Sequence, residues 1–538
     1  MTGAFNIGLQ SRENTDVSRF RASTPGGTQL NRKFIRLLAV GAVVALGIGS
    51  QSTNSLAATA KKKPRTTKPK ATTTTNAAPA ATAAPTTPPK TENTASDQGV
   101  SKDTIKIVNL SADLSALVKA GFIQGVPVDS AERVAKRVSY YTDKWNAAGG
   151  FNGRKIVTEL VTWNPVDPRS FDKACQKISL ESKPFMVIAP GGGYPADSTP
   201  CIAGDGNTLF FTPDPVGLET FARSKGNLLT AAPPAEALAE AGAQAAIDLE
   251  QLPKGARIGV LRGNARFQDD AWAAAKKVLD AAGYKVVFSD AVSSDGLDTA
   301  TVAANVRLAV PKMQDAGVTH VLHMMNFTSG SAFGPEAIKS GFKPKYVMLE
   351  VGSGQCTPFS AGQWQAMMDK MVCATSFDQF RVNTAGQIQK DTPFEAQCRK
   401  EEETLYGVAT TPGVPYGSFT IKDAQGNTFQ DDQSYVLCGF LNAAKVAFEK
   451  AGQNLTKSSF KQALYAIGDH PMAGMSNGKG SFSEKKPWES TALQFVEFQA
   501  PDPVAQRTGK VGGLYGRCLT PSGCWRVLPG GWKQIKNP

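Results

Sequence analysis

NAAGGFNGRKIVTELVTW, residues 146–163, joins a helix to a strand through a short glycine-rich turn. The amphipathic run that starts at Val134 predicts a helix that ends at Gly149 and Gly150, because glycine enters the left-handed region at little cost. Asn152-Gly153 is a turn dipeptide for the same reason. Residues 155–163 then follow the two-residue period of a strand. The stretch therefore predicts a helix, a tight turn and a strand.

Strand and helix patterns alternate on both sides of this stretch. The first unit is predicted to have strands at 105–115, 155–163, 184–190 and 208–214, with helices at 129–148 and 167–180. The pattern then restarts, with helices at 234–249, 269–283, 303–316 and 334–340 and strands at 256–263, 284–290, 319–325 and 345–350. Alternating βα units with nearly continuous apolar strands indicate parallel sheets covered by helices on both faces. The predicted fold class is α/β, with two doubly wound units.

A third region follows the second unit. It is predicted to contain helices at 393–406, 432–452 and 457–467 and a late strand at 491–498. The amphipathic face of residues 435–450 is typical of a helix that packs against a core. Residues 501–538 are rich in Gly and Pro and are predicted to form an appended C-terminal tail.

The net charge of +13 is concentrated at the N-terminus. Residues 1–100 hold 13 Lys and Arg against 4 Asp and Glu, which leaves 46 against 42 in residues 101–538. The globular part is thus nearly neutral. It also contains no basic helix or aromatic-basic module, so we expect no nucleic-acid partner.

Residues 31–60 have the pattern of an export signal. Arg32, Lys33 and Arg36 precede an apolar run at 37–48, and small residues that suit cleavage follow at 55–60. The run is shorter than the ~20 residues of a membrane span, although an uncleaved anchor remains an alternative. Residues 1–30 form a polar extension ahead of the signal. Residues 61–100, rich in Lys, Pro, Thr and Ala, are predicted to be a disordered linker.

The chain contains eight cysteines, and an even number in an exported protein predicts disulfide bonds. Eight cysteines allow 105 connectivities, of which pairing between neighbours is the simplest because each loop stays local. The predicted pairs are Cys175–Cys201, Cys356–Cys373, Cys398–Cys438 and Cys518–Cys524.

Patterns typical of enzymes and metal sites are poor. No GxSxG motif stands at a strand-to-helix turn, and residues 474–481 lack the spacing of a phosphate-binding loop. His320 and His323 are predicted to lie on opposite faces of one strand, which suits packing better than metal binding. Asp269 and Asp270 are predicted to open a helix, where carboxylates complement the helix dipole. We therefore expect neither an enzyme nor a metal or cofactor site.

Taken in order, these elements resemble the type I periplasmic binding proteins, in the leucine/isoleucine/valine-binding branch that serves ABC importers, in a secreted form of the actinobacterial type. The resemblance covers about residues 101–500. It rests on IKIVNLSA, AAGGFNGRKIVTELV, DPRSFDKACQKI, VIAPGGGYPADSTPC, LFFTPD, ARIGVLRGNARFQDDAWAAAKKVLDAAGYKVV, GVTHVLHMMN, IKSGFKP and QSYVLCGFLNAAKVAFEKAG.

The resemblance implies two Rossmann-like lobes joined by three crossover strands, with a ligand trapped between them. Lobe 1 would comprise residues 101–232 and 375–475, and lobe 2 residues 233–374 and 476–500. The implied function is an extracytoplasmic solute-binding protein at the cell envelope that delivers a small polar solute, such as an amino acid or amide, to an ABC permease. A cell-surface sensor or envelope-associated binding module with the same fold is the alternative.

The resemblance also implies which residues contact the ligand. The loop with Gly192, Gly193 and Tyr194 matches the segment that grips a ligand carboxylate, although an ordinary connecting loop remains the alternative. Glu350 ends a strand and is expected either to hold a ligand ammonium or to be a surface carboxylate. The full set of expected ligand-binding residues is Leu114, Trp163, Gly192, Gly193, Tyr194, Thr212, Asp214, Phe267, Asn326 and Glu350.

Three of these positions depart from the pattern of the family. Phe267 stands where the family usually places a stacking tyrosine followed by glycine, so a hydroxyl is lost. Trp163-Asn164 stands where the family often has an acidic pair, and Asp214 is unusual in its loop. These differences argue against a standard branched-chain amino acid as the ligand.

Overall fold

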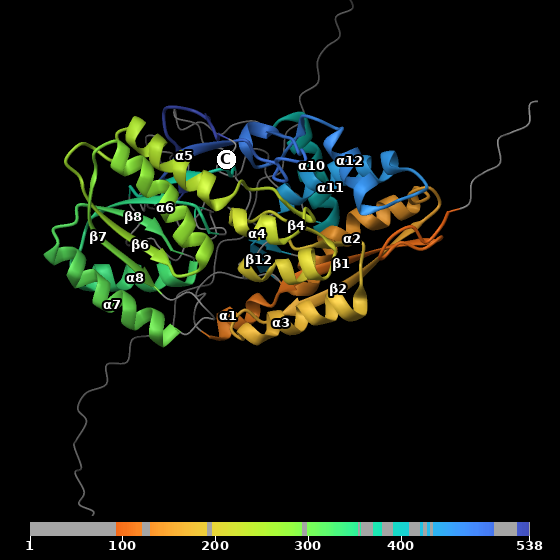
Figure 1. Cartoon of the computed structure of the whole chain (residues 1–538), viewed down its shortest axis with the longest axis horizontal. Coiled ribbons are helices and arrows are strands. Elements are labelled where there is room, and N and C mark those ends of the chain that lie inside the picture. Colours follow the sequence, from red (N-terminus) through yellow and green to blue (C-terminus); the bar gives the residue numbers. More distant parts are fainter. Residues whose placement is uncertain are drawn as a thin grey trace, which may run out of the picture. The chain divides into compact units, whose positions relative to one another are not determined.

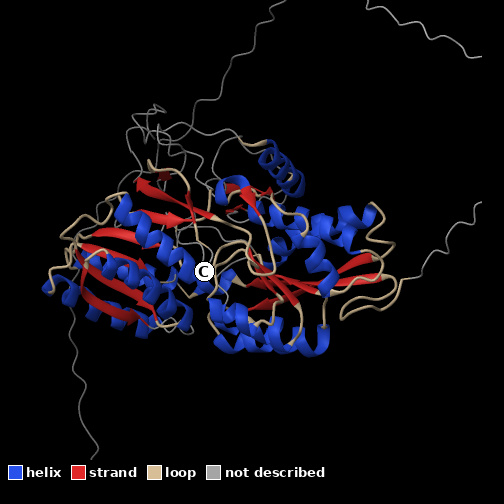
Figure 2. Cartoon of the chain, turned by 45° about the horizontal axis from the view of Figure 1, so that its top comes forward, coloured by secondary structure: helices blue, strands red, loops and turns tan. Residues whose placement is uncertain are grey.

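The computed structural model describes residues 93–120, 130–190, 196–292, 299–325, 327–352, 356, 370–378, 391–407, 420–422, 428–430, 434–499 and 524–536. The predicted export signal and most of the predicted linker lie outside these residues. No helix within the described residues is long and apolar enough to cross a membrane. In each of two lobes, strands are sandwiched between helices, as Figure 2 shows.

Lobe 1 is built on a five-stranded parallel sheet of order β2-β1-β3-β4-β5. Its strands are β1 (Thr104–Ala112), β2 (Lys155–Trp163), β3 (Met186–Ile188), β4 (Leu209–Thr212) and β5 (Leu228–Thr230). Because all five strands run the same way, their carboxyl ends share one edge of the sheet. Ligands of doubly wound folds bind beyond that edge.

Helices cover both faces of this sheet. One face packs against α2 (Ala131–Ala147), α10 (Pro393–Tyr406), α11 (Ser434–Ala451) and α12 (Lys457–Tyr465). The other face packs against α1 (Leu114–Lys119), α3 (Pro168–Gln176), η1 (Lys177–Ser182), η3 (Cys201–Asp205) and α4 (Leu218–Arg223). In Figure 1 the blue α11, late in the sequence, lies beside the orange α2, and the two helices are in contact.

The connection at residues 146–163 has the predicted form. The α2 helix ends at Ala147, with Ala148 as its C-cap, and Gly149 and Gly150 then have positive φ angles of 106° and 74°. Asn152 and Gly153 are also in the left-handed region, and Phe151 and Arg154 close the turn by an antiparallel bridge. Strand β2 then pairs with β1 in parallel over nine residues.

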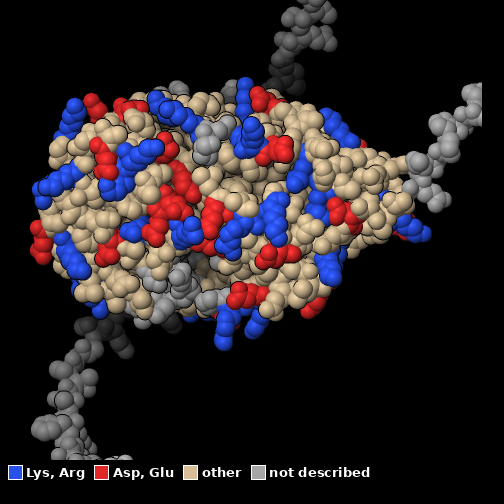
Figure 3. Space-filling view, viewed as in Figure 1, with Lys and Arg blue, Asp and Glu red and all other residues tan. Residues whose placement is uncertain are grey.

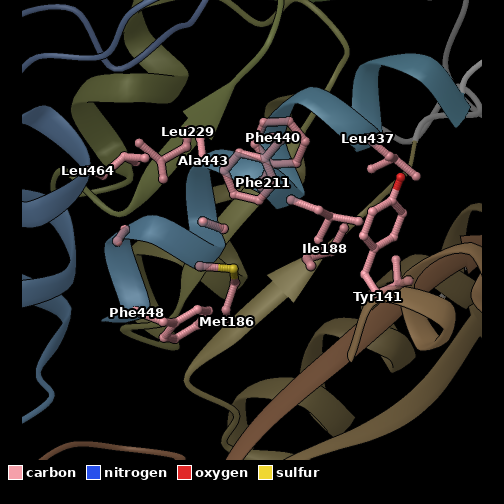
Figure 4. Close-up of a cluster of buried hydrophobic side chains, with 14 of the residues drawn as sticks. Tyr141, Met186, Ile188, Phe211, Leu229, Leu437, Phe440, Ala443, Phe448 and Leu464 are labelled. Atoms are coloured by element: carbon pink, nitrogen blue, oxygen red, sulfur yellow. The ribbon is translucent and has the colours of Figure 1, made fainter. Parts of the chain in front are cut away.

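The core between the lobe 1 sheet and its helices is rich in aromatic side chains. Phe211 on β4 stacks on Phe440 of α11, with ring centroids 3.4 Å apart and planes 5° from parallel. Figure 4 shows this pair beside Leu229 and Ala443, with Ile188 and Tyr141 further along the same layer. Both phenylalanine side chains are fully buried. This contact joins a strand of the first predicted unit to a helix more than 200 residues later.

Lobe 2 contains an eight-stranded sheet whose main path is β16-β15-β10-β9-β8-β6-β7. Its parallel part comprises β6 (Arg257–Gly263), β7 (Lys285–Val292), β8 (His320–Met324), β9 (Lys345–Leu349) and β10 (Val372–Thr375). Antiparallel pairing adds β15 (Ala492–Gln499), β16 (Cys524–Val527) and β17 (Lys533–Gln534). Residues 524–536, expected to be part of an appended tail, therefore belong to this sheet.

Within the described residues, helices cover both faces of the lobe 2 sheet. α5 (Ala235–Asp248) and α6 (Arg266–Ala281) lie on one face, and α7 (Thr299–Asp315) and α8 (Phe327–Lys339) on the other. The α6 helix begins at Arg266, three residues before the predicted start, and Asp269 lies in its first turn, near the helix N-terminus as predicted. The remaining short elements are β11 (Thr420–Lys422), β12 (Thr428–Gln430), β13 (His470–Pro471), β14 (Lys479–Gly480), η2 (Ala196–Ser198) and η5 (Ser476–Gly478).

Three of the four expected disulfides are formed in the structure. Cys175–Cys201 joins α3 to η3, Cys356–Cys373 joins the segment after β9 to β10, and Cys398–Cys438 joins α10 to α11. The fourth expected pair includes Cys518, which lies outside the described residues. Each formed bond is local to one lobe, so the disulfides leave movement between the lobes possible.

Residues 93–100, the end of the predicted linker, are fixed to the amino-terminal edge of the lobe 1 sheet. Asp97 accepts a hydrogen bond from the Lys457 backbone N–H at 2.7 Å and pairs with the Lys457 ammonium. Gln98 donates to the Pro184 carbonyl ahead of β3, at 3.2 Å. The Arg154 guanidinium lies beneath them and donates to three backbone carbonyls, those of Thr94, Ser101 and Gln453, at 2.7–2.9 Å.

Replacing Arg154 with methionine is expected to lower the free energy of unfolding by about 3 kcal/mol. The arginine residue is fully buried, and its loss leaves three carbonyls without their charged donor, each such bond being worth about 1.5–3 kcal/mol. Urea unfolding of the variant and the native chain measures the difference. Arg169→Met, at an exposed arginine side chain, is the control. Equal stabilities for the Arg154 variant and the native chain contradict this role.

Candidate functional site

The carboxyl edge of the lobe 1 sheet carries buried polar side chains. Thr212 is the last residue of β4, and its hydroxyl accepts the backbone N–H of Asp214 at 3.2 Å. Both residues are buried, with Asp214 only 3% exposed. The structure therefore places these two predicted site residues side by side at the edge where doubly wound folds bind ligands.

The corresponding edge of the lobe 2 sheet carries Glu350, which follows β9. Its carboxylate accepts the backbone N–H of Cys356 at 3.0 Å and the hydroxyl of Thr375 at the end of β10. Glu350 is 3% exposed, so the alternative of a surface carboxylate is wrong. In this structure the carboxylate holds the ends of two neighbouring strands together, beside the Cys356–Cys373 disulfide.

Glu350 and the two cysteines of this disulfide are residue types that bind metals. The ligand atoms of Glu350, Cys356 and Cys373 lie within 4.8 Å of one another. Metals bind cysteine as a thiolate, and the disulfide uses both sulfur atoms. The oxidised cluster therefore offers a metal only one carboxylate, which the Cys356 N–H and the Thr375 hydroxyl already engage.

Phe267 lies where the two lobes approach each other. It sits in the first turn of α6, is partly buried, and packs against the hydrophobic clusters of both lobes. A Cβ atom on Gly217, just before α4, would come within 2.8 Å of the Phe267 Cβ. A glycine at 217 therefore allows α4 of lobe 1 to approach α6 of lobe 2 closely.

Polar contacts surround this approach of α4 and α6. Arg266 pairs with Glu219 of α4 at 2.5 Å, and Glu236 of α5 accepts the backbone N–H of Leu218 at 2.9 Å. Burial raises the pKa of Glu236, and nearby acidic side chains add to that effect while the N–H of Leu218 opposes it. Basic and acidic side chains are interspersed over the face shown in Figure 3.

Two other predicted site residues lie in the core of lobe 1 in this structure. The Trp163 side chain is 6% exposed and packs edge-on against Phe171 of α3, with ring centroids 5.5 Å apart. Leu114, the first residue of α1, is partly buried against the same cluster. Their packing is explained without a ligand, and ligand contact by either residue stays a prediction.

Four predicted site residues lie outside the described residues. They are Gly192, Gly193, Tyr194 and Asn326. The two histidines of β8 are described, and they lie on opposite faces of the strand as predicted. His323 is fully buried, and burial lowers its pKa to about 3, so its imidazole is neutral.

The described chain passes between the lobes at three places, which lie side by side. Strand β5 leads into α5 and pairs with residues 487–490, where the Glu489 N–H donates to the Thr230 carbonyl at 2.9 Å. The segment after β10 is bridged to residues 474–476, where the Ser476 N–H donates to the Ser376 carbonyl at 2.9 Å. Few, hydrogen-bonded connections of this kind form the hinge of proteins that close around a ligand.

A buried ion pair supports this hinge. The imidazole of His470 and the carboxylate of Glu489 lie 2.7 Å apart, with Glu489 fully buried. Burial alone lowers the pKa of His470, but the hydrogen bond and charge of Glu489 outweigh it and raise the pKa above the ordinary value. The nearby Lys486, whose pKa burial lowers to about 8, opposes that rise and donates to three backbone carbonyls of the same segment.

The contribution of His470 to the stability of the chain is expected to fall as pH rises from about 6.5 through the folded-state pKa of this histidine. A group whose pKa is raised on folding stabilises the native state fully below its unfolded pKa and loses that effect above its folded pKa. Melting temperatures measured between pH 5.5 and 7.5 test this. His470→Gln is expected to remove this decline. Subtracting the variant's melting temperature from that of the native chain at each pH cancels the opposite effect of His320 and His323, whose pKa values burial lowers. An unchanged decline in the His470 variant contradicts this assignment.

Comparisons with known proteins agree with the geometry. The model of the family described as periplasmic binding protein matches residues 122–387. The solute-binding protein of an ABC transporter from Rhodopseudomonas palustris BisB5, solved with 3,4-dihydroxybenzoic acid, superposes with a TM-score of 0.54 and 13% identity, over 81% of this chain and 99% of that one. No curated protein matches the sequence.

Two further solved structures share the fold. The leucine-, isoleucine-, valine-, threonine- and alanine-binding protein from Brucella ovis has a TM-score of 0.55 and 14% identity, over 81% of this chain and 97% of that one. The fatty acid ABC transporter substrate-binding protein from Thermomonospora curvata has a TM-score of 0.51 and 15% identity, over 82% of this chain and 93% of that one. These relatives bind solutes and are not enzymes. Residues 122–387 therefore match the periplasmic binding protein family, and the described lobes share the fold of these solved binding proteins.

Proposed function

We propose that this chain is an extracytoplasmic solute-binding protein that traps a small polar solute between lobes 1 and 2 and presents it to an ABC importer. The observation that carries the proposal is the arrangement of two doubly wound lobes around one three-segment hinge, within a family of periplasmic binding proteins. Polar side chains at the carboxyl edges of both sheets, Thr212 and Asp214 in lobe 1 and Glu350 in lobe 2, support it.

The expected location is the cell envelope, with residues 31–60 as the export signal. The hydrogen bonds that hold residues 93–100 join them to lobe 1 alone. A tether through the preceding linker would therefore leave lobe 2 able to move. The solute itself is not inferred from relatives, because their bound molecules range from amino acids to dihydroxybenzoic acid.

A thermal-shift screen of the purified full-length chain tests this function. The solutes are amino acids, amides, hydroxybenzoates and fatty acids. A solute at 100 times its dissociation constant adds ~2.7 kcal/mol to the free energy of unfolding, which raises the melting temperature by several degrees. Absence of a shift with every solute class contradicts the proposal. A shift without association with any ABC permease would instead support the sensor.

A further inference from the structure

The central strand of lobe 1 carries two polar side chains where its position predicts apolar ones. Strand β1 lies between β2 and β3, in a sheet that helices cover on both faces, and such strands are nearly continuously apolar. Its residues Ile105 and Ile107 follow that rule and join the core beneath α2 and α11. Asn109 and Ser111 continue the same face, because side chains alternate along a strand, and each is only 1% exposed.

Both polar side chains lie towards the carboxyl end of the strand. Asn109 pairs in register with Leu160 of β2 and Ile188 of β3, the last residue of β3. Ser111 pairs with Thr162 and stands one residue before the end of β1. The two side chains therefore follow each other along one face up to the edge of the sheet where the proposed solute enters.

Each side chain has a buried oxygen that the described residues leave without a hydrogen-bond partner. The Asn109 side-chain oxygen Oδ1 and the Ser111 hydroxyl Oγ are buried and have no hydrogen-bond partner among the residues that the structure describes. A buried polar atom without a partner destabilises the folded chain. By contrast, the buried amide of Asn227, between β4 and β5, donates to the Ala203 carbonyl at 3.0 Å and to Asn207 at 3.2 Å. A buried asparagine of the same lobe is therefore satisfied by the protein, whereas Asn109 Oδ1 is not.

We propose that Asn109 and Ser111 bind the uncharged polar group of the solute and so determine its class. The inference rests on the proposed function. An amide and a hydroxyl each donate and accept hydrogen bonds, so together they fit a solute hydroxyl or carboxamide. Neither residue carries a charge that could balance a buried ion, and a buried ion without a partner is strongly unfavourable. The charged ends of the solute therefore lie elsewhere, and this pair selects a solute that carries a neutral hydrogen-bonding substituent.

Matched solute pairs test this assignment by calorimetry on the full-length chain. The pairs are threonine and valine, asparagine and leucine, and 4-hydroxybenzoate and benzoate. For the pair that it recognises, the native chain is expected to bind the member with the hydroxyl or amide at least about tenfold more tightly than its partner. A tenfold ratio of dissociation constants corresponds to ~1.4 kcal/mol of binding free energy. Asn109→Leu and Ser111→Ala are each expected to reduce that ratio, and the double variant is expected to bring it close to one.

The ligand-free variants give a second readout. Removing an unsatisfied polar atom leaves stability equal or higher, so Asn109→Leu and Ser111→Ala are expected to keep or raise the melting temperature without solute. The matched control Asn227→Leu, which removes a satisfied amide, is expected to lower it. A lower melting temperature in both test variants, with the solute ratio unchanged, would mean that the pair holds an ordered water only, and that result overturns the inference.

The outcomes also separate this inference from the function on which it rests. A native chain that binds none of the solutes contradicts the proposed function. A native chain that binds one member of a pair, with a preference that survives in the double variant, contradicts the assignment of Asn109 and Ser111 alone. A reduced preference in the double variant, with an undiminished melting temperature, supports both the proposed function and the assignment of Asn109 and Ser111.

Discussion

Phe211→Ala is expected to lower the free energy of unfolding by about 3–5 kcal/mol, the usual range for a buried phenylalanine. The ring is fully buried and stacks on Phe440 with centroids 3.4 Å apart. Its removal leaves a cavity between β4 and α11, which belong to distant parts of the sequence. The loss combines the transfer free energy of the ring, the cavity and the stacking contact.

Urea unfolding of the variant and the native chain measures this effect. Leu180→Ala is the matched control, because that large apolar side chain is 68% exposed and its truncation is expected to change stability by less than about 0.5 kcal/mol. If both variants unfold at the same urea concentration, β4 and α11 do not share a core.

Removing the Cys398–Cys438 disulfide is also expected to have a large effect, lowering the free energy of unfolding by ~4 kcal/mol. The two residues are 40 positions apart in the sequence, and their Cα atoms are 5.9 Å apart in the folded chain. A cross-link that closes a loop of this length restricts the unfolded chain by about that free energy. The bond also fixes α10 against α11, so the variant Cys398→Ala/Cys438→Ala is expected to loosen this side of lobe 1.

Two measurements check the disulfide. Melting of the double variant gives the loss in stability, and peptide mapping of the native chain without reductant identifies the linked cysteines. A map that links Cys398 to a cysteine other than Cys438, or an unchanged melting temperature, contradicts the pairing.

Much of the fold follows from local rules that the sequence displays. The turn at residues 149–153 requires left-handed backbone, and glycine and asparagine occupy those positions. The capping box at Thr392 and Glu395 and the αL glycine at Gly407 likewise define α10. Where the backbone conformation suits only one or two residue types, as at this turn and at the ends of α10, the sequence predicts where an element begins or ends.

Elements specified by tertiary contacts were missed. Strand β5 has only three residues, Leu228–Thr230, too few to display a period. It is a strand because β4 and residues 487–490 supply hydrogen-bond partners. The start of α6 was placed three residues late because Ala265, its N-cap, makes no side-chain cap bond. The short helices α1 and α4 give equally weak signals.

The candidate site was predictable in outline and less so in detail. The polar residues Thr212, Asp214 and Glu350 lie at the carboxyl edges of their sheets, as βα alternation implies. The face of the strand on which a side chain lies decides whether it packs in the core or reaches the site. Trp163 lies on the face that packs against Phe171. Asn109 and Ser111 were not singled out, although the sequence IKIVNLSA showed the signal: two polar residues in phase with Ile105 and Ile107 on one face of a buried strand.

The distance between the lobes, measured with and without solute, tests most directly whether this chain traps its ligand between them. Fluorescent labels on Leu180→Cys in lobe 1 and Leu308→Cys in lobe 2, both at exposed positions, report this distance in single molecules. Saturation with a solute from the thermal-shift screen is expected to shift the distance distribution to a narrower, displaced population, because the hinge closes around the ligand. A solute that binds tightly and leaves the distribution unchanged contradicts closure, and with it the central claim that this chain traps its ligand between two lobes.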